Sequence, residues 1–125
     1  MKIRVYYEDT DTGGIVYHSN YLNYCERARS EAFFSRGLSP DLNTGAFVAK
    51  KLEANFIKPA KLGDMLEVKS ELLNMKSASF ILKQTIYKEN EKIFELDITL
   101  AYINHDGRPQ KLGEAKALVE QLFVV

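Results

Sequence analysis

The chain has 125 residues, of which 46% are hydrophobic and 27% charged, and this composition is typical of one globular domain. Its 17 basic and 17 acidic residues cancel to a formal net charge of zero, which excludes an overall attraction to nucleic acid or anionic membranes. Cys25 is the single cysteine, so an internal disulfide is excluded. No apolar run is long enough to span a membrane, and Glu8, Asp9 and Asp11 interrupt the start before a signal-peptide core could form. We therefore expect a cytoplasmic protein.

The first third of the chain is expected to form a strand, a loop and one long helix. Residues 2–8 alternate apolar and polar side chains, as a strand does. Residues 9–17 are typical of a loop, and residues 19–36 have a helical pattern that Gly37 ends. The apolar stripe of this helix consists of Tyr21, Tyr24, Cys25, Ala28 and Ala32. The charged positions expected on the helix surface or in contacts between subunits are Glu26, Arg27, Arg29 and Glu31.

Strand-like segments dominate the rest of the chain. Ser39 and Pro40 are typical of the start of a short helical turn before Gly45. The four expected strands cover residues 46–57, 65–75, 79–88 and 92–104. Residues 113–122 fit a helix or a strand, and their Ala, Leu, Glu and Lys content favours a helix. One amphipathic helix and one antiparallel sheet must bury each other, so the expected architecture is α+β, with a curved sheet wrapped around one long helix in a single domain over residues 1–125.

The segment DTDTGGIVYH, from Asp9 to His18, places two carboxylates and a Gly-Gly pair directly before the helix. The first amides of a helix lack intrahelical partners and carry partial positive charge, so they stabilise an oxygen that becomes negative. Asp11 could fold over the same spot, and Gly14 would let the backbone approach a ligand closely. A carboxylate beside oriented amides is a minimal site for acyl transfer. The same residues also suit an ordinary turn and helix cap, and spacing alone favours that structural interpretation.

A longer stretch resembles a known family. The segment RVYYEDTDTGGIVYHSNYLNYCERARSE, from Arg4 to Glu31, is similar to the signature of hot-dog fold acyl-CoA thioesterases. The resemblance is closest to the YbgC group, which is related to the 4-hydroxybenzoyl-CoA thioesterases, and it extends more loosely over Phe47 to Val68. It implies a hot-dog fold, in which the sheet wraps one central helix. It also implies hydrolysis of an acyl-CoA to a free acid and coenzyme A.

The resemblance implies roles for individual residues. Asp11, the second acid of the motif, would be the catalytic carboxylate, acting as nucleophile or as general base. The backbone amide of His18 would bind the thioester oxygen, and its imidazole would orient substrate or water. Tyr17 would line the acyl pocket. Among the lysines that could meet the phosphates of coenzyme A, Lys58 flanks a turn and Lys76 lies where related thioesterases carry basic residues; a solvated surface role is equally open for both.

The resemblance also implies an assembly. Hot-dog proteins usually form homodimers or homotetramers with the active site at an interface, so residues 47–50 or 56–58 of a second chain would complete the pocket. Acyl carrier protein could present the thioester instead of coenzyme A. No metal or other cofactor is expected, because His18, His105 and Cys25 lack metal-ligand spacing. Two other functions stay open: a non-catalytic acyl-thioester binding protein, and a hot-dog dehydratase or hydratase.

Overall fold

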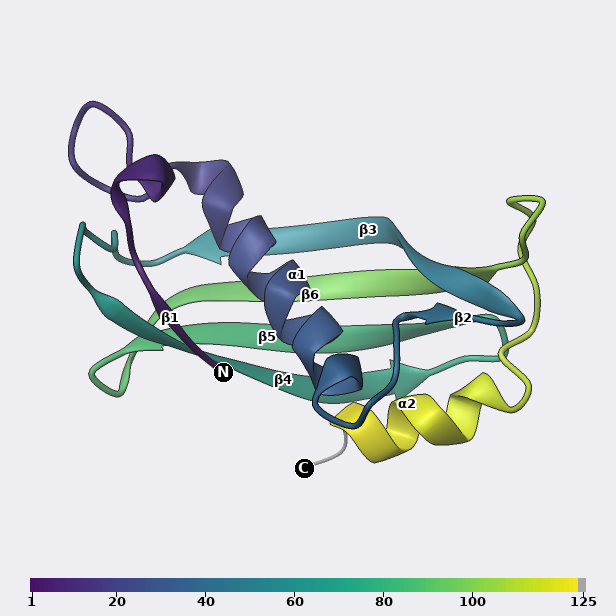
Figure 1. Cartoon of the computed structure of the whole chain (residues 1–125). Helices are drawn as coiled ribbons and strands as arrows, with labels where there is room; N and C mark the ends of the chain where they lie inside the picture. Colours follow the sequence, from purple (N-terminus) through teal and green to yellow (C-terminus); the bar gives the residue numbers. More distant parts are fainter. Residues whose placement is uncertain (124–125) are drawn as a thin grey trace.

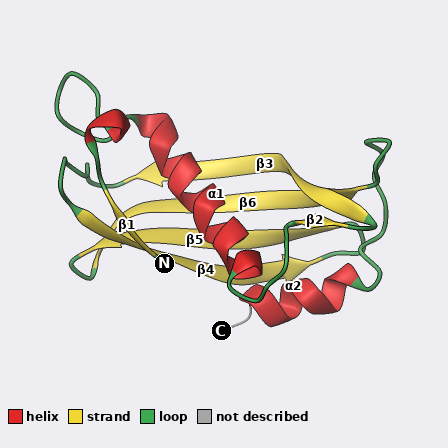
Figure 2. Cartoon of the chain, viewed as in Figure 1, coloured by secondary structure: helices red, strands yellow, loops and turns green. Residues whose placement is uncertain are grey.

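Six strands form one curled antiparallel sheet, and a long helix crosses one of its faces (Figures 1 and 2). The computed structural model describes residues 1–123. The strand order is β1-β4-β5-β6-β3-β2. The elements in chain order are β1 (Lys2–Arg4), the 3₁₀ turn η1 (Tyr7–Asp9), α1 (His18–Phe34), β2 (Asp41–Leu42), β3 (Gly45–Phe56), β4 (Met65–Met75), β5 (Ser79–Lys88), β6 (Glu91–Ile103) and α2 (Ala115–Phe123). The predicted α+β architecture is confirmed.

The core forms where the apolar stripe of α1 meets the sheet. Of the five predicted stripe residues, Tyr21, Tyr24, Cys25 and Ala28 are at most 8% exposed, and Ala32 is half-buried. Phe33, which the predicted stripe omitted, is also buried. Burial alternates along β6, and the buried side chains of this strand include Phe94, Leu96, Ile98, Leu100 and Tyr102. Burying each such side chain contributes about 1.5–3 kcal/mol, so this interface supplies most of the driving force for folding.

A polar bridge crosses the same interface and joins α1 to β5. Gln84 is fully buried, and its Nε2 donates to the Cys25 carbonyl at 2.9 Å and to Ser70 Oγ at 3.0 Å. Its Oε1 accepts a hydrogen bond from Arg29 Nη1 at 2.8 Å. Arg29 is therefore half-buried rather than fully solvated on the helix surface, and the expected alternative, a contact between subunits, stays a prediction. The side chain turns inward, and burial lowers the pKa of its guanidinium.

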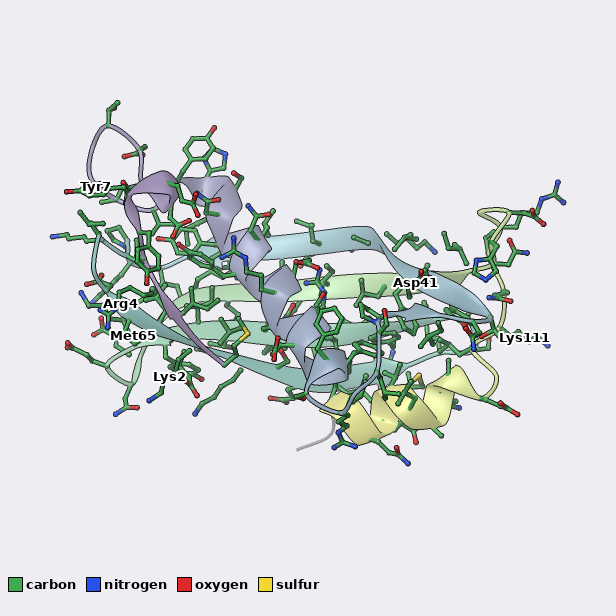
Figure 3. All side chains as sticks on the ribbon, in the orientation of Figure 1. Lys2, Arg4, Tyr7, Asp41, Met65 and Lys111 are labelled. Carbon is green, nitrogen blue, oxygen red and sulfur yellow. The ribbon has the colours of Figure 1, made fainter. Side chains whose placement is uncertain are left out.

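The N-terminal strand is shorter than predicted. It ends at Arg4, which pairs with Met65 at the edge of the sheet (Figure 3) and donates to the Gly63 carbonyl at 2.7 Å. The chain then turns into η1, because Asp9 Oδ2 accepts a hydrogen bond from the Tyr6 amide at 3.0 Å. The alternating pattern of residues 2–8 does not contain this capping interaction.

The segment after α1 forms a β-hairpin rather than the predicted helical turn. In this hairpin Asp41 pairs with Ala46, and Leu42 pairs with Gly45. Glycine is required at position 45, since a Cβ there would lie 2.2 Å from the carbonyl oxygen of Ile103 in the neighbouring strand. The Ser-Pro signal is local, whereas this pairing depends on a contact with β6, which is distant in sequence.

The other elements agree closely with the predictions. Strands β4 and β5 have the predicted bounds, and β3 and β6 differ by one residue at each end. Gly37 follows α1 with φ of +73°, a left-handed conformation suited to ending a helix. The C-terminal segment forms α2, which confirms a helix there. Across residues 1–123, no helix is both long and apolar enough to span a membrane.

Candidate active site

The loop between η1 and α1 is closed by its own hydrogen bonds. The Asp11 amide donates to the Ile15 carbonyl at 2.9 Å, and the Gly14 amide donates to the Asp11 carbonyl at 3.0 Å. Gly14 has φ of +80°, which favours glycine at this turn. The exposed Asp11 carboxylate accepts the Gly13 amide on Oδ1 at 2.8 Å, while its Oδ2 makes no hydrogen bond within the described part of the chain. One carboxylate oxygen is thus positioned, and the other is open to a reactant.

Helix α1 begins at His18 without a side-chain cap. Its first amides therefore carry uncompensated partial positive charge. The Asp9 carbonyl accepts the Tyr17 amide at 2.9 Å and Asn20 Nδ2 at 2.9 Å. These two bonds attach the first turn of α1 to the segment that precedes Asp11, so they set the position of the loop relative to the helix.

Asp11 and His18 line one cavity of about 350 Å³. Its other walls come from the loop, from α1 and from the chain that leaves β3. They consist of Ile15, Val16, Tyr21, Phe56, Ile57, Lys58 and Pro59. A mostly apolar cavity with one carboxylate and an uncapped helix start can hold a neutral acyl group and polarise its carbonyl.

Among the residues predicted to bind substrate, Lys58 is the one that lines this cavity, and its Nζ pairs with Glu91 Oε1 at 3.0 Å. Gly14 shapes the loop and is not part of the cavity wall. Tyr17 is 47% exposed and packs on the His18 ring at 4.3 Å, outside the lining. Lys76 follows the far end of β4, about 33 Å along that strand from Met65 at 3.3 Å per residue. Within one chain, the structure does not bring Lys76 near Asp11.

Cys25 and Asp9 have structural positions rather than positions in the candidate site. Cys25 is fully buried, and burial raises the pKa of its thiol to about 12, so it is not a poised nucleophile. Asp9 is 6% exposed and bonds to the backbone.

The sequence interpretation missed that Phe56, Ile57 and Pro59 form walls of this chain's own cavity. It placed Tyr21 on the apolar stripe of the helix, and Tyr21 also lines the cavity. The walls are placed by long-range pairing, in which the Val16 amide donates to the Ala60 carbonyl at 2.9 Å. No local pattern in the sequence carries that pairing.

The curled sheet, the helix across it and the carboxylate at the start of that helix together define a hot-dog domain. The chain belongs to the thioesterase superfamily, because residues 13–95 match that family. It is similar to the acyl-CoA thioesterase YbgC of Helicobacter pylori, with 41% identity over 83% of this chain and 85% of the relative. It is also similar to the acyl-CoA thioester hydrolase YbgC of Escherichia coli, with 37% identity over 82% and 79% of the two chains. A solved structure of a probable thioesterase from Bartonella henselae superposes with a TM-score of 0.84 and 31% identity, covering 90% of this chain and 96% of the other. The predicted family and fold are confirmed.

Proposed function

We propose that this protein hydrolyses the thioester of an acyl-CoA to a free acid and coenzyme A, with Asp11 as the catalytic carboxylate. The observation that carries the proposal is that Asp11 and the uncapped start of α1 at His18 line one cavity. The similarity to acyl-CoA thioesterases supports the same reaction.

The reaction follows from the two parts of the site, which are the Asp11 carboxylate and the first amides of α1. The thioester carbonyl points at the first amides of α1. In one route, water adds to the carbonyl carbon while Asp11 takes its proton. In the other route, Asp11 itself adds to this carbon. In both, the helix amides stabilise the negative charge that develops on the carbonyl oxygen. One such donor is worth about 3 kcal/mol in the transition state. The C–S bond then breaks, and coenzyme A leaves as a thiolate. A thiol pKa of about 8.5 makes it a good leaving group, so no Ser-His-Asp triad is required.

Asp11 can act by two routes that share this geometry, and oxygen labelling identifies the nucleophilic route when water opens the mixed anhydride at the Asp11 carbonyl carbon. A single turnover in H₂¹⁸O that yields labelled acid fits direct attack by water with Asp11 as general base. Unlabelled acid in the first turnover means that the new oxygen came from Asp11 through a mixed anhydride.

The function is tested by thiol release from acetyl-, butyryl-, hexanoyl-, palmitoyl- and benzoyl-CoA. We expect Asp11→Asn, which is nearly isosteric, to lower kcat at least about a hundredfold. Asp106→Asn, at an exposed turn residue, is the matched control and should retain full activity. Full activity of Asp11→Asn would show that the carboxylate assignment is wrong.

The alternative functions give other outcomes of the same assay. Binding of acyl-CoA without thiol release indicates a binding protein, and a change in the acyl chain with the thioester intact indicates a dehydratase or hydratase. Release from acyl carrier protein thioesters alone identifies that carrier as the partner. A coenzyme A thioester substrate and a reduced, buried Cys25 both favour the cytoplasm as the location.

We also propose that the chain forms a homodimer through β3. This strand pairs with β6 along its length, but β2 covers its other edge only at Gly45 and Ala46. The uncovered edge also exposes Val48, Leu52 and Phe56, which are 39% to 56% exposed. A long edge strand with unpaired backbone groups favours pairing with another chain, and a twofold axis closes the pairing between two copies.

A twofold axis through β3 reverses the strand in the second copy. The segment near Phe47 of the partner subunit then lies beside Phe56 and the cavity, so that a second chain completes the pocket. Light scattering is expected to give twice the chain mass for the unmodified protein, or four times if two dimers associate. Leu52→Lys is expected to yield an inactive monomer. A folded, active monomer of the unmodified protein would refute the dimer.

A further inference from the structure

Tyr21 lines the Asp11 cavity, yet its side chain is only 4% exposed. Its Oη accepts a hydrogen bond from the Ala60 amide at 3.0 Å. A protein donor thus occupies one side of the oxygen, and the hydroxyl hydrogen must point elsewhere. Within residues 1–123, no protein acceptor lies in hydrogen-bonding geometry with this hydrogen. A buried O–H is stable when it is paired, so an acceptor bound in the cavity would complete it.

The packing around the ring holds this hydroxyl in place. The Tyr21 ring stacks on Phe94 with centroids 5.1 Å apart and meets Phe56 edge-on at 5.7 Å. Burial raises the pKa of Tyr21, and the charge of Asp64 adds to this effect while the Ala60 amide opposes it. The hydroxyl therefore keeps its hydrogen at neutral pH and remains a neutral donor.

The position of Tyr21 on α1 directs this donor toward the start of the helix. Tyr21 follows His18 by three residues, so both lie on the same face, about 4.5 Å apart along the axis at 1.5 Å per residue. Helical side chains lean toward the N-terminus, which is also where the first amides point. Tyr21 and His18, at the start of the helix, thus line the same cavity.

We propose that Tyr21 Oη donates a hydrogen bond to the carbonyl oxygen of the bound thioester, which makes Tyr21 a further catalytic residue beside the helix amides. This inference rests on the proposed thioesterase function. The carbonyl oxygen is the group on which negative charge develops, so a preorganised neutral donor stabilises it more in the transition state than in the bound substrate.

The kinetic test compares Tyr21→Phe with Tyr24→Phe. Tyr24 is the matched control, because its hydroxyl is also buried but its side chain does not line the cavity. We expect Tyr21→Phe to lower kcat by about tenfold to a hundredfold while KM changes less than about threefold. Tyr24→Phe should stay within about twofold of the unmodified protein in both constants. Unchanged kcat in Tyr21→Phe overturns the proposal.

A binding test separates this role from a structural one. Two unreactive coenzyme A analogues are compared: a ketone that keeps the carbonyl and a thioether that lacks it. Tyr21→Phe should weaken binding of the ketone at least about fivefold and leave the thioether affinity unchanged, because only the ketone offers the acceptor. An equal change for both analogues, or none for either, overturns the proposal.

A second variant covers the case in which Tyr21→Phe unfolds because the Ala60 amide loses its acceptor. Placing 3-fluorotyrosine at position 21 keeps Oη and alters only its acidity. A changed ratio of ketone to thioether affinity supports the hydrogen bond, and an unchanged ratio overturns it. Failure of the proposed function is visible separately, as the absence of thiol release by the unmodified protein.

Discussion

Replacing Gln84 by leucine should strongly destabilise the protein, because Gln84 is the buried polar bridge between α1 and β5. The substitution removes one hydrogen bond to a charged group, at Arg29, and two neutral ones, to Ser70 and to the Cys25 carbonyl. A bond to a charged group contributes about 1.5–3 kcal/mol and a neutral one about 1 kcal/mol, together about 4 kcal/mol. The apolar contacts of leucine offset part of this, so the free energy of unfolding should fall by about 3 kcal/mol.

A double-mutant cycle separates the bridge from simple packing loss. Urea unfolding of Gln84→Leu, Arg29→Leu and the double variant, at one protein concentration, gives the coupling free energy. Each single substitution leaves either the Arg29 guanidinium or Gln84 Oε1 without its partner, whereas the double substitution removes both of these groups. We expect a coupling of about 2 kcal/mol, with the double variant more stable than the sum of the single changes predicts. Additivity within about 0.5 kcal/mol would refute the bridge, as would an Arg29→Leu cost typical of a surface site.

Three further predictions concern the helix start, the thiol and the outer face of the sheet. Asn20→Ala removes the side-chain bond to the Asp9 carbonyl. It should lower kcat at least about tenfold while thermal stability changes little, and unchanged kcat would contradict the positioning role. Burial raises the pKa of Cys25 to about 12, so a thiol reagent at pH 8 should label it only as urea unfolds the protein; rapid labelling of the native protein would contradict its burial. The bond from Lys83, with a smaller contribution from Lys92, lowers the pKa of Glu95. This stabilisation is present above the unfolded pKa of about 4.3 and is lost as the pH falls. The melting temperature of Glu95→Gln should therefore lie below that of the unmodified protein at pH 7, and the difference should shrink toward pH 3. A difference that stays constant with pH would contradict the pairing.

The predictions of secondary structure succeeded where burial imposes a repeat on the sequence. The helix stripe through Tyr21 and Tyr24 and the alternation along β6 each reflect one buried face, and both are visible in a single sequence. The prediction after Pro40 failed because the hairpin there is held by pairing with β3, and Gly45 is required by a contact with Ile103. Contacts of that kind join residues that are distant in sequence, so no local pattern contains them.

The candidate site was also predicted only in part from the sequence. Asp11 and the start of α1 are seven residues apart in the sequence, so a short motif indicates both halves of the chemistry. The cavity wall at Phe56 and Pro59 depends on how the chain leaving β3 passes the loop, which the motif does not specify. The inward turn of Arg29 was missed for a related reason, since a basic residue in a helix is normally solvated and Gln84, its partner, lies 55 positions away.

The two acids of the motif show why residue type alone does not identify a catalytic group. Asp9 and Asp11 are two residues apart and chemically identical, yet Asp9 is 6% exposed while Asp11 lies open at the cavity. Asp9 bonds to the Tyr6 amide through its carboxylate and to the first turn of α1 through its carbonyl, so it holds the loop against the helix. Asp11 bonds only within its own loop and keeps one oxygen open. A carboxylate whose contacts fix the scaffold cannot move toward a reactant, whereas one held by a single amide can accept a proton or attack, and this difference supports the proposal that Asp11 rather than Asp9 carries the chemistry.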